Sequence, residues 1–263
     1  MAYTQSMEKD EHVLAEITEL TKNYRPSAET ATMVANTPIV LLVGVTGAGK
    51  DTVKRFLLET GEYHHIISHT TRPPRENGGV MEQDGKDYHF IDLEASKRML
   101  EAGEYVEAKM VHGTVYGTSV AEVKAAADTG KIAITDVDVQ GVAEYKAISG
   151  NVIAVFLMPP NYTEWQRRLH ARYGSRGVDP KDMRVRMESA IKELEVALSA
   201  DYYHFVVNEH VDLTAAIVDK IAHNRDEFNA IDTAVRNIAR DLALDLREKI
   251  YESDVTASNE TEN

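Results

Sequence analysis

The sequence contains no cysteine. Disulfide bonds, zinc–thiolate sites and cysteine nucleophiles are therefore excluded, and the composition suits a reducing compartment. Long apolar runs are also missing, since the longest lie near 39–43 and 152–158 and a membrane-spanning helix needs ~20 residues. The first residues do not have the basic segment and apolar stretch of a secretory signal. We therefore expect a cytoplasmic protein with no membrane association.

Basic residues are in deficit, because 29 Lys and Arg stand against 43 Asp and Glu and leave a formal net charge of −14. Nucleic-acid binding depends on neutralising many backbone phosphates, so we expect no nucleic-acid partner. A small anionic ligand needs only a local positive pocket and stays possible. The hydrophobic content of 43% over 263 residues is enough for one large domain or two modest ones.

The clearest motif is a glycine-rich turn between an apolar segment and a helical one. Residues 40–43 are typical of a parallel strand buried on both faces, and residues 52–58 continue with helical spacing. Between them the pattern G-x-x-x-x-G-K ends on Lys50. Such glycines let successive backbone N–H groups face phosphate oxygens, while the helix start and the lysine add positive charge. The predicted residues of this nucleoside triphosphate site are Gly44, Val45, Thr46, Gly47, Ala48, Gly49, Lys50, Asp51 and Thr52.

The motif departs from its usual form directly after the lysine. A Ser or Thr that reaches Mg²⁺ normally stands there, whereas this chain has Asp51 and carries its first hydroxyl on Thr52. Asp136 ends another apolar segment, at the carboxyl edge of the predicted sheet where ligands of open α/β folds bind. Mg²⁺ is then held by the Asp51 carboxylate, through water, or chiefly by the nucleotide and Asp136. We predict Asp51 and Asp136 as the metal-binding residues, with water in the Asp51 contact.

From Pro38 onward short apolar segments alternate with helical ones, which favours an α/β architecture around a central parallel sheet. The predicted strands are 39–43, 64–69, 131–136, 152–158 and 203–207, and the predicted helices are 50–60, 140–149, 161–173 and 182–199. The stretch 70–118 breaks this rhythm and has strand-like pieces at 88–91 and 105–111. We expect it to form an inserted lobe.

The two ends of the chain are expected to lie outside this α/β region. Residues 7–24 have helical apolar spacing and precede a Ser/Thr/Ala stretch, which predicts a helix and a linker over 1–37. Residues 212–250 predict one or two helices, and the polar, acidic segment 252–263 is expected to be disordered. These extensions are candidates for homo-oligomer contacts.

Five further blocks follow the glycine-rich motif in a fixed order, namely Ser68 to Arg75, Gly85 to Phe90, Tyr105 to Glu107, His112 to Thr118 and Thr135 to Gly141. At these spacings the blocks resemble the guanylate kinase family over about residues 38–222. The resemblance implies a P-loop NTPase-type three-layer fold and an enzyme that uses Mg²⁺ and transfers the γ-phosphoryl group of ATP to GMP or dGMP in purine nucleotide metabolism. Its implied parts are a core of 38–67 and 119–211, a mixed α+β GMP-binding lobe of 68–118, a helical lid at about 172–183 and an extension of 223–263.

The resemblance also implies eight contacts to GMP. The implied phosphate contacts are Arg72, Arg75, Tyr88 and Tyr116, and the implied base contacts are Ser68, Glu107, Thr118 and Asp138. The chemistry suits both sets, since two guanidinium groups stiffened by neighbouring prolines fit a phosphate monoester. Guanine presents an O6 acceptor and N1–H and N2–H₂ donors. A selective pocket therefore needs hydroxyl donors at the O6 end and carboxylate acceptors at the other end.

A further charged segment, 165–177 with Arg184 and Arg186 after it, resembles the helix, lid and returning helix that close over ATP. The family runs from helix to lid as arginine-glycine, whereas here three residues, 173–175, lengthen the turn. Either Arg172 or Arg176 therefore fits the catalytic position. The predicted catalytic residues are Lys50, Arg168, Arg172 and Arg186, with Arg176 as the alternative to Arg172.

Two alternatives to this function stay open. A related P-loop kinase acting on a ribose bisphosphate shares the lysine–aspartate pair, but it needs neither Glu107 nor Asp138 to read a base. A catalytically inactive guanylate-kinase-like binding module is expected to have lost Gly49, Lys50 or the lid arginines, and all are present.

Overall fold

The computed structural model describes residues 2–77, 79–111, 113–173, 177–224 and 232–261. The chain forms two compact units, each assembled from three separate stretches. Unit 1 comprises Met1–Ile39, Tyr63–Thr135 and Ala143–Val152. Unit 2 comprises Val40–Glu62, Asp136–Val142 and Ile153–Asn263. These units group the chain by compactness, so the division into core, lobe and lid stays a prediction.

The parallel strands are β1 (Ile39–Gly44), β2 (Tyr63–His65), β9 (Ile132–Asp136), β10 (Ile153–Met158) and β11 (Tyr203–Val207), in the order β11-β10-β1-β9-β2. Every residue of β1 and β10 is buried, which is why both read as continuous apolar runs. In unit 2, β10 pairs in parallel with β1 and with β11. In unit 1, β2 pairs in parallel with β9. The predicted α/β fold is confirmed.

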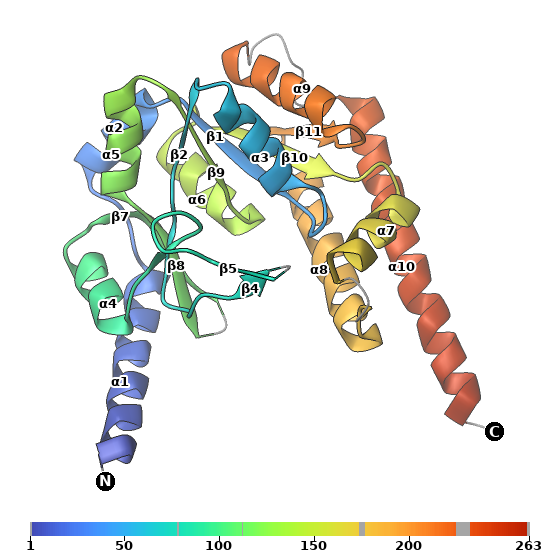
Figure 1. The fold of residues 1–263 in the computed structure, drawn as a ribbon, viewed down its shortest axis with the longest axis horizontal. Helices are drawn as coiled ribbons and strands as arrows, with labels where there is room; N and C mark the ends of the chain where they lie inside the picture. Colours follow the sequence, from blue (N-terminus) through green and yellow to red (C-terminus); the bar gives the residue numbers. More distant parts are fainter. Residues whose placement is uncertain (1, 78, 112, 174–176, 225–231, 262–263) are drawn as a thin grey trace. The chain divides into compact units, whose positions relative to one another are not determined.

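The helices of unit 2 are α3 (Lys50–Glu59), α7 (Tyr162–Tyr173), α8 (Pro180–Leu198), α9 (Val211–His223) and α10 (Thr233–Thr261). Helix α9 packs on α3, and α10 runs along α8 (Figure 1). The buried guanidinium of Arg236 in α10 donates to the carbonyls of Leu198 and Ala200, each at 2.8 Å. It thereby satisfies carbonyl groups at the end of α8 that have no partner within the helix.

Unit 1 holds α1 (Ala2–Lys22), α2 (Ala28–Asn36), α4 (Leu93–Glu101), α5 (Val120–Thr129) and most of α6 (Val139–Ile148). A second sheet runs β6-β3-β8-β7, with β6 at His89–Phe90, β3 at His69–Thr70, β8 at Thr114–Ser119 and β7 at Tyr105–Val111. A small hairpin joins β4 (Glu76–Asn77) to β5 (Val80–Met81). The segment from His69 to Ser119 thus contributes all four strands of this mixed sheet, and its assignment as an inserted lobe stays a prediction.

The N-terminal helix α1 packs on this second sheet and on α4 (Figure 1). Its Val13 and Ile17 are buried in one core cluster with Leu100 and Tyr105. The hydroxyl of Tyr24 donates to the carbonyl of Tyr105 at 2.6 Å and accepts the Tyr105 N–H at 3.1 Å. Helix α1 therefore packs on the mixed sheet of unit 1, and its assignment to a separate N-terminal segment stays a prediction.

The segment expected to be a linker contains helix α2. The Ser27 hydroxyl accepts the N–H of Thr30 at 3.1 Å and caps the helix start, and Thr30 and Val34 are buried. The acidic segment expected to be disordered continues α10 as far as Thr261. In that segment the Asp254 carboxylate accepts from Arg184 Nη2 of α8 at 3.2 Å. Both terminal extensions, 1–37 and 223–263, contain more helix than their polar composition predicted, because a cap and contacts from neighbouring helices stabilise them.

The predicted strand 64–69 is two strands. Strand β2 ends at His65, and β3 begins at His69 in the other sheet of unit 1. Inside the lobe the pattern predicted β6 and β7 but missed β8 and α4. Strand β8 contains Gly117 and two threonines, so its composition resembles that of a loop.

None of the described helices is both long enough and apolar enough to cross a membrane.

Candidate functional site

The glycine-rich loop, residues 45–49, lies in unit 2 between the buried strand β1 and helix α3. Gly44 has φ 142°, and a Cβ there would lie 1.9 Å from the carbonyl oxygen of Leu157 in the neighbouring strand β10. Gly49 has φ 88° and is the N-cap residue of α3. Only glycine fits these two positions, which fix the tight turn from strand to helix. The turn places backbone N–H groups and the positive helix start together, as an anion site requires.

Lys50 begins α3, and its ammonium group folds back over the loop. In the described structure Lys50 Nζ donates to the carbonyl oxygen of Gly44. Glu193 of α8 feels the charge of Lys50. Burial raises the pKa of the Glu193 carboxyl, the charge of Lys50 lowers it, and that of Asp138 raises it. A lysine held at the mouth of the loop is positioned to add a full charge to a phosphate site.

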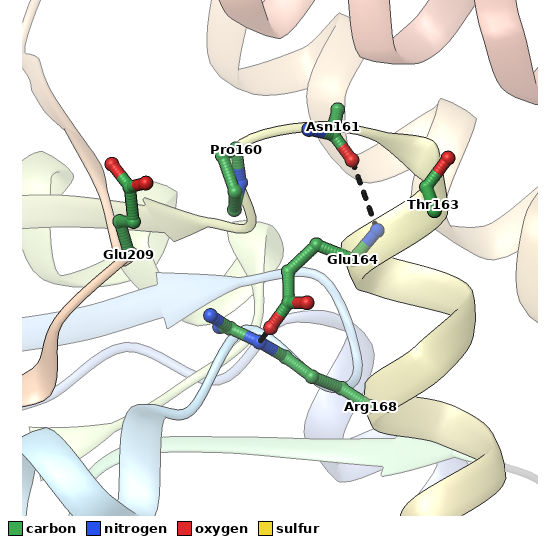
Figure 2. Close-up of a pocket in the computed structure, with 6 residues that line it drawn as sticks. All are labelled: Pro160, Asn161, Thr163, Glu164, Arg168 and Glu209. Atoms are coloured by element: carbon green, nitrogen blue, oxygen red, sulfur yellow. Dashed lines mark hydrogen bonds and ion pairs between the residues drawn. The ribbon is translucent and has the colours of Figure 1, made fainter.

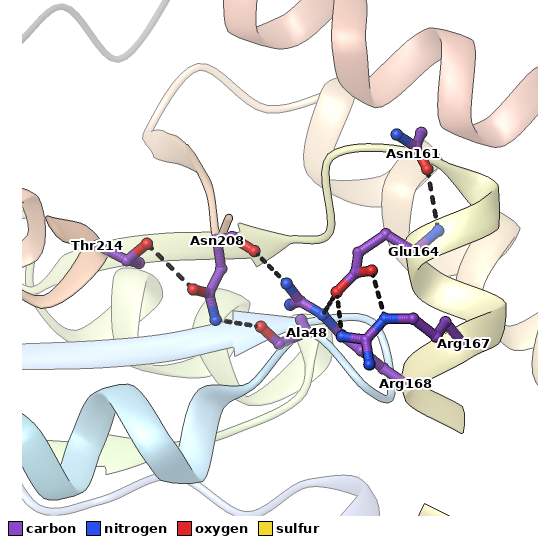
Figure 3. Close-up of polar contacts among 7 residues, drawn as sticks. All are labelled: Ala48, Asn161, Glu164, Arg167, Arg168, Asn208 and Thr214. Atoms are coloured by element: carbon purple, nitrogen blue, oxygen red, sulfur yellow. Dashed lines mark hydrogen bonds and ion pairs between the residues drawn. The ribbon is translucent and has the colours of Figure 1, made fainter. Parts of the chain in front are cut away.

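Two side chains distant in sequence hold the loop in shape, and Figure 3 shows the contacts of one of them, Asn208. The indole N–H of Trp165 donates to the Thr46 carbonyl at 2.9 Å. The buried amide of Asn208 donates to the Ala48 carbonyl at 2.7 Å, and its oxygen accepts the Thr214 hydroxyl at 3.1 Å. The sequence pattern did not predict that Trp165, Asn208 and Thr214 support the loop. The single Trp of the chain and an Asn directly after a strand were the available signals.

Helix α7 brings Glu164, Trp165 and Arg168 to the loop. Asn161 caps this helix, because its side-chain oxygen accepts the N–H of Glu164 at 2.9 Å. The guanidinium of Arg168 donates to Glu164 Oε1 and to the carbonyl of Asn208, each at 2.7 Å. Hydrogen bonds from Arg167 and then Arg168 lower the pKa of Glu164 to about 2. Arg168 is thus held in place by an ion pair with Glu164 and by the carbonyl of Asn208, the residue that supports the loop.

A cavity of about 550 Å³ opens beside this arginine (Figure 2). Its lining residues are Pro160, Asn161, Thr163, Glu164, Arg168 and Glu209. The Arg168 guanidinium reaches the Glu164 carboxylate at the edge of the cavity. One arginine therefore contacts both the support of the loop and an open volume in unit 2.

The other predicted lid arginines lie on helices α7 and α8 of unit 2. Arg172 is exposed in the last turn of α7, and Arg186 is half-buried on α8. Arg176, the alternative to Arg172, falls outside the described residues. The choice between these two arginines stays a prediction.

The two predicted metal-binding carboxylates lie close to a lysine in unit 2. Asp136 ends strand β9, and its Oδ1 accepts from Lys54 Nζ of helix α3. The same ammonium group lies 4.0 Å from Asp51 Oδ1. Asp138, two residues further on, accepts the Gly141 N–H at 2.8 Å and so caps the start of α6. The sequence pattern missed Lys54.

The predicted phosphate contacts of GMP cluster in unit 1 around a carboxylate that the sequence pattern also missed. Arg72 is buried, and its guanidinium donates twice to Glu82, at 2.5 and 2.9 Å. It stacks over the Tyr88 ring with its central carbon 4.8 Å from the ring centre, and the rings of Tyr88 and Tyr116 lie 6.1 Å apart. Arg75 is exposed and donates its backbone N–H to Glu82 at 2.8 Å. Glu82 therefore binds the guanidinium of Arg72 and the backbone of Arg75.

The predicted base contacts Glu107 and Thr118 are paired across strands β7 and β8 of unit 1. The Thr118 hydroxyl donates to Glu107 Oε1 at 2.8 Å, and both side chains are buried. Burial raises the pKa of Glu107 well above its usual range, Lys109 opposes this shift, and Glu144 adds to it. The neighbouring Glu144 carboxyl thus favours a protonated Glu107 in the absence of ligand.

The other two predicted base contacts lie elsewhere in the chain. Ser68 is half-buried between β2 and β3, and its carbonyl accepts the His89 N–H at 2.9 Å. Asp138 belongs to unit 2, whereas Ser68, Glu107 and Thr118 belong to unit 1. The structure thus brings Glu107 and Thr118 into direct contact, and the roles of Ser68 and Asp138 at the base stay predictions.

A buried parallel strand, a glycine-rich loop and a helix that begins on a lysine define the class of α/β proteins that bind phosphate groups at a helix start. Likeness to known proteins narrows the class. The profile of the family described as Guanylate kinase matches residues 35–225. The chain belongs to the guanylate kinase family.

Several relatives carry this family name. Guanylate kinase of Sulfurimonas denitrificans is 35% identical over 205 residues, which cover 76% of this chain and 95% of that protein. Guanylate kinase 1 of Arabidopsis thaliana is 35% identical over 176 residues, which cover 66% of this chain but only 43% of that protein. The chain therefore spans less than half the length of this plant relative. The crystal structure of guanylate kinase from Anaplasma phagocytophilum matches with a TM-score of 0.55 and 28% identity, covering 73% of this chain and 87% of that one.

The supports of the loop lead to a prediction for Asn208. Replacing Asn208 with Ala leaves the Ala48 carbonyl and the Thr214 hydroxyl without their present partner in a buried position. Each unsatisfied group costs about 1 to 3 kcal/mol, so we expect the free energy of unfolding to fall by about 2 kcal/mol or more. Urea denaturation followed by circular dichroism measures this change.

The matched control for Asn208→Ala is Asn224→Ala, at an exposed asparagine of the same unit. We expect the control to change the free energy of unfolding by less than about 0.5 kcal/mol. Equal effects of the two substitutions would mean that Asn208 does not support the loop.

Proposed function

We propose that this chain is a guanylate kinase that transfers the γ-phosphoryl group of ATP to GMP or dGMP, giving ADP and GDP or dGDP. The observation that carries the proposal is the glycine-rich loop, held by Trp165 and Asn208, in a chain of the guanylate kinase family. The activity fits a role in purine nucleotide metabolism. A cytoplasmic location stays a prediction from composition.

On the donor side, the N–H groups of the glycine-rich loop and the start of α3 bind the phosphates of ATP. Lys50 leaves the Gly44 carbonyl and pairs with the phosphate groups. Arg168, Arg172 and Arg186 add positive charge around the transferring group as the lid closes and excludes water. Arg168 is the best supported of these three, because its guanidinium already lies beside the loop and faces an open cavity.

On the acceptor side, Arg72, Arg75, Tyr88 and Tyr116 hold the phosphate of GMP, and Ser68, Glu107, Thr118 and Asp138 read its base. The pairing of Thr118 with Glu107 supports the second set, because it places a hydroxyl and a carboxyl side by side. The cluster of Arg72 and Tyr88 around Glu82 supports the first set. A phosphate that enters this cluster competes with Glu82 for the Arg72 guanidinium.

The chemistry needs no general base, because the attacking atom is an ionised phosphate oxygen of GMP. A bond forms between this oxygen and the γ-phosphorus of ATP, and the bond from that phosphorus to the bridging oxygen breaks as ADP leaves. The transition state is loose, so catalysis depends on alignment and on neutralising charge on the transferring oxygens. The chain supplies this charge through Lys50 and the lid arginines.

The residues present also fit Mg²⁺, which takes oxygen ligands. Asp51 and Asp136 offer carboxylates in unit 2, and Thr52 follows with a hydroxyl. The ammonium group of Lys54 bound to Asp136 supports this assignment, because that carboxylate already holds a cation. When bound, the ion neutralises charge on the phosphates of ATP.

The proposed partners are therefore the small molecules ATP and GMP, with no nucleic acid. Self-association through α1 and α10 stays a prediction, and sedimentation of the full chain would test it.

The direct test is incubation of the purified chain with ATP, Mg²⁺ and GMP, followed by chromatographic separation of the nucleotides. The proposal requires GDP and ADP to appear in equal amounts. ADP without GDP would mean that the chain hydrolyses ATP and does not use GMP as acceptor.

The assignment of Arg75 to the GMP site and not to the ATP site gives a second prediction. Replacing Arg75 with Ala removes a charge-assisted contact to the GMP phosphate, so we expect the KM for GMP to rise by at least about tenfold. The KM for ATP should stay nearly constant. Arg98→Ala, at an exposed arginine of α4 in the same unit, is the matched control. Equal increases in both KM values for Arg75→Ala would contradict its assignment to GMP.

A further inference from the structure

Lys54 is a cation in a place that normally disfavours one. It is the fifth residue of α3, close to the positive end of the helix dipole and one turn after Lys50. Its side chain is only 13% exposed. A mostly buried ammonium group at a helix start needs negative partners to offset its desolvation.

Two carboxylates provide that compensation, and both are the predicted metal-binding residues. Lys54 Nζ forms an ion pair with Asp136 Oδ1 and lies 4.0 Å from Asp51 Oδ1. Asp136 is 33% exposed, whereas Asp51 is 84% exposed and lies one helical turn before Lys54. The ammonium group thus stands at the point between two carboxylates where a divalent cation would bind.

This arrangement also accounts for the unusual residue after the lysine of the glycine-rich motif. Exchanging a hydroxyl for the Asp51 carboxylate adds a negative charge to the site. Lys54 adds the opposite charge three residues later on the same helix, in the orientation that favours an acid-to-base pair. The two residues together leave the net charge of the loop region unchanged.

We propose that Lys54 occupies the cation position between Asp51 and Asp136 in the nucleotide-free protein and thereby excludes a free divalent cation from it. Lys54 is then a positioning residue, and the metal ion enters only together with ATP, whose phosphates help to displace the ammonium group. The assignment of these carboxylates to Mg²⁺ rests on the proposed function, whereas the exclusion of a free cation rests on the ion pair alone.

The test is Mn²⁺ binding to the nucleotide-free full chain, measured by electron paramagnetic resonance of the free ion. Replacing Lys54 with Met keeps the apolar stem and removes the charge. We expect the variant to bind Mn²⁺ at least about tenfold more tightly than the wild type, because a positive charge leaves the site. Lys54→Arg keeps the charge and should retain the weak binding of the wild type.

A second group of potential ligands makes one more variant necessary. Glu62, Asp219 and His223 of unit 2 offer ligand atoms that all lie within 4.8 Å of one another. Adding Asp136→Asn to Lys54→Met should therefore abolish the gain in Mn²⁺ affinity. Lys54→Gln repeats the test, and thermal unfolding confirms that each variant is folded.

An unchanged Mn²⁺ affinity in folded Lys54→Met and Lys54→Gln would overturn the proposal, as would a gain that persists with Asp136→Asn. The titration contains no nucleotide, so its outcome is independent of GMP turnover. A chain without guanylate kinase activity can still show the gain, and an active chain can fail to show it.

Discussion

Replacing Lys50 with Met is expected to lower kcat for the formation of GDP by about 10²- to 10³-fold, the usual loss when one preorganised donor to transition-state charge is removed. Lys50 begins α3 at the mouth of the glycine-rich loop, and its ammonium group leaves the Gly44 carbonyl when it binds a phosphate. The KM for GMP should stay nearly constant, since the lysine belongs to the donor side. Steady-state kinetics with ATP and GMP each varied measures both quantities.

The matched control for Lys50→Met is Lys124→Met. Lys124 is an exposed lysine of α5 in unit 1, its partner is Asp128 at 2.8 Å, and it is not one of the predicted site residues. We expect its kcat to equal that of the wild type. A kcat for folded Lys50→Met within about tenfold of the wild type would show that the lysine does not act on the transferring group.

Replacing Glu107 with Gln is expected to lower kcat/KM for GMP by about 10²- to 10⁴-fold. Guanine needs an acceptor for its N1–H and N2–H₂ groups, and the amide presents a donor in a buried position that Thr118 already shares. The loss should appear mainly in the KM for GMP. Glu104→Gln, at an exposed glutamate just before the same strand, is the matched control. Equal kcat/KM values for Glu107→Gln and the wild type would remove Glu107 from the base site.

The titration of Glu107 predicts that the affinity for GMP and the free energy of unfolding change with pH in opposite directions. The raised pKa of Glu107, caused first by burial, means that the ligand-free protein keeps a proton on this carboxyl at neutral pH. The charged and titratable groups facing it are Lys109, Glu144, Tyr105 and Tyr145. Affinity for GMP should therefore rise with pH as Glu107 becomes a carboxylate. Calorimetric titration of GMP at several pH values measures this slope.

The stability of the ligand-free protein should change in the other direction. The contribution of the neutral Glu107 carboxyl is complete below its usual pKa of 4.5 and is lost as the pH rises through the raised folded pKa. The free energy of unfolding should therefore fall with rising pH in this window. Glu107→Gln should flatten both slopes, whereas Glu104→Gln should keep them. An unchanged pH dependence in Glu107→Gln would contradict the proton on the Glu107 carboxyl.

The sequence predicted what depends on local pattern. A continuous apolar run followed by glycines and a lysine allows few structures, so β1, the loop and the start of α3 could be predicted directly. The supports of the loop could not be predicted in this way, because Asn208 is 160 residues from Ala48 and Trp165 is 119 residues from Thr46. Such contacts depend on the order of the strands, which residue spacing does not contain.

Charge pairing explains the other omissions. Lys54, Glu82 and Glu144 look like surface residues in the sequence, yet each lies against a predicted site residue. A single sequence names the residues that contact a ligand more readily than the residues that balance their charge. The terminal segments differ from their prediction because contacts outside the local pattern stabilise them. Helix α2 has a capping residue, and the end of α10 contacts a neighbouring helix, although both are polar in composition.

The central claim is that the acceptor of this chain is GMP, and the most direct measurement is ADP release from ATP with a panel of acceptors. GMP, dGMP, AMP, UMP and ribose bisphosphate would each be offered at several concentrations, and kcat/KM would be compared. We expect GMP and dGMP to be used, and AMP to be poorer by about 10⁴-fold, because adenine leaves the buried polar groups of the base site unpaired. Preference for ribose bisphosphate, or no turnover with GMP, would contradict the account.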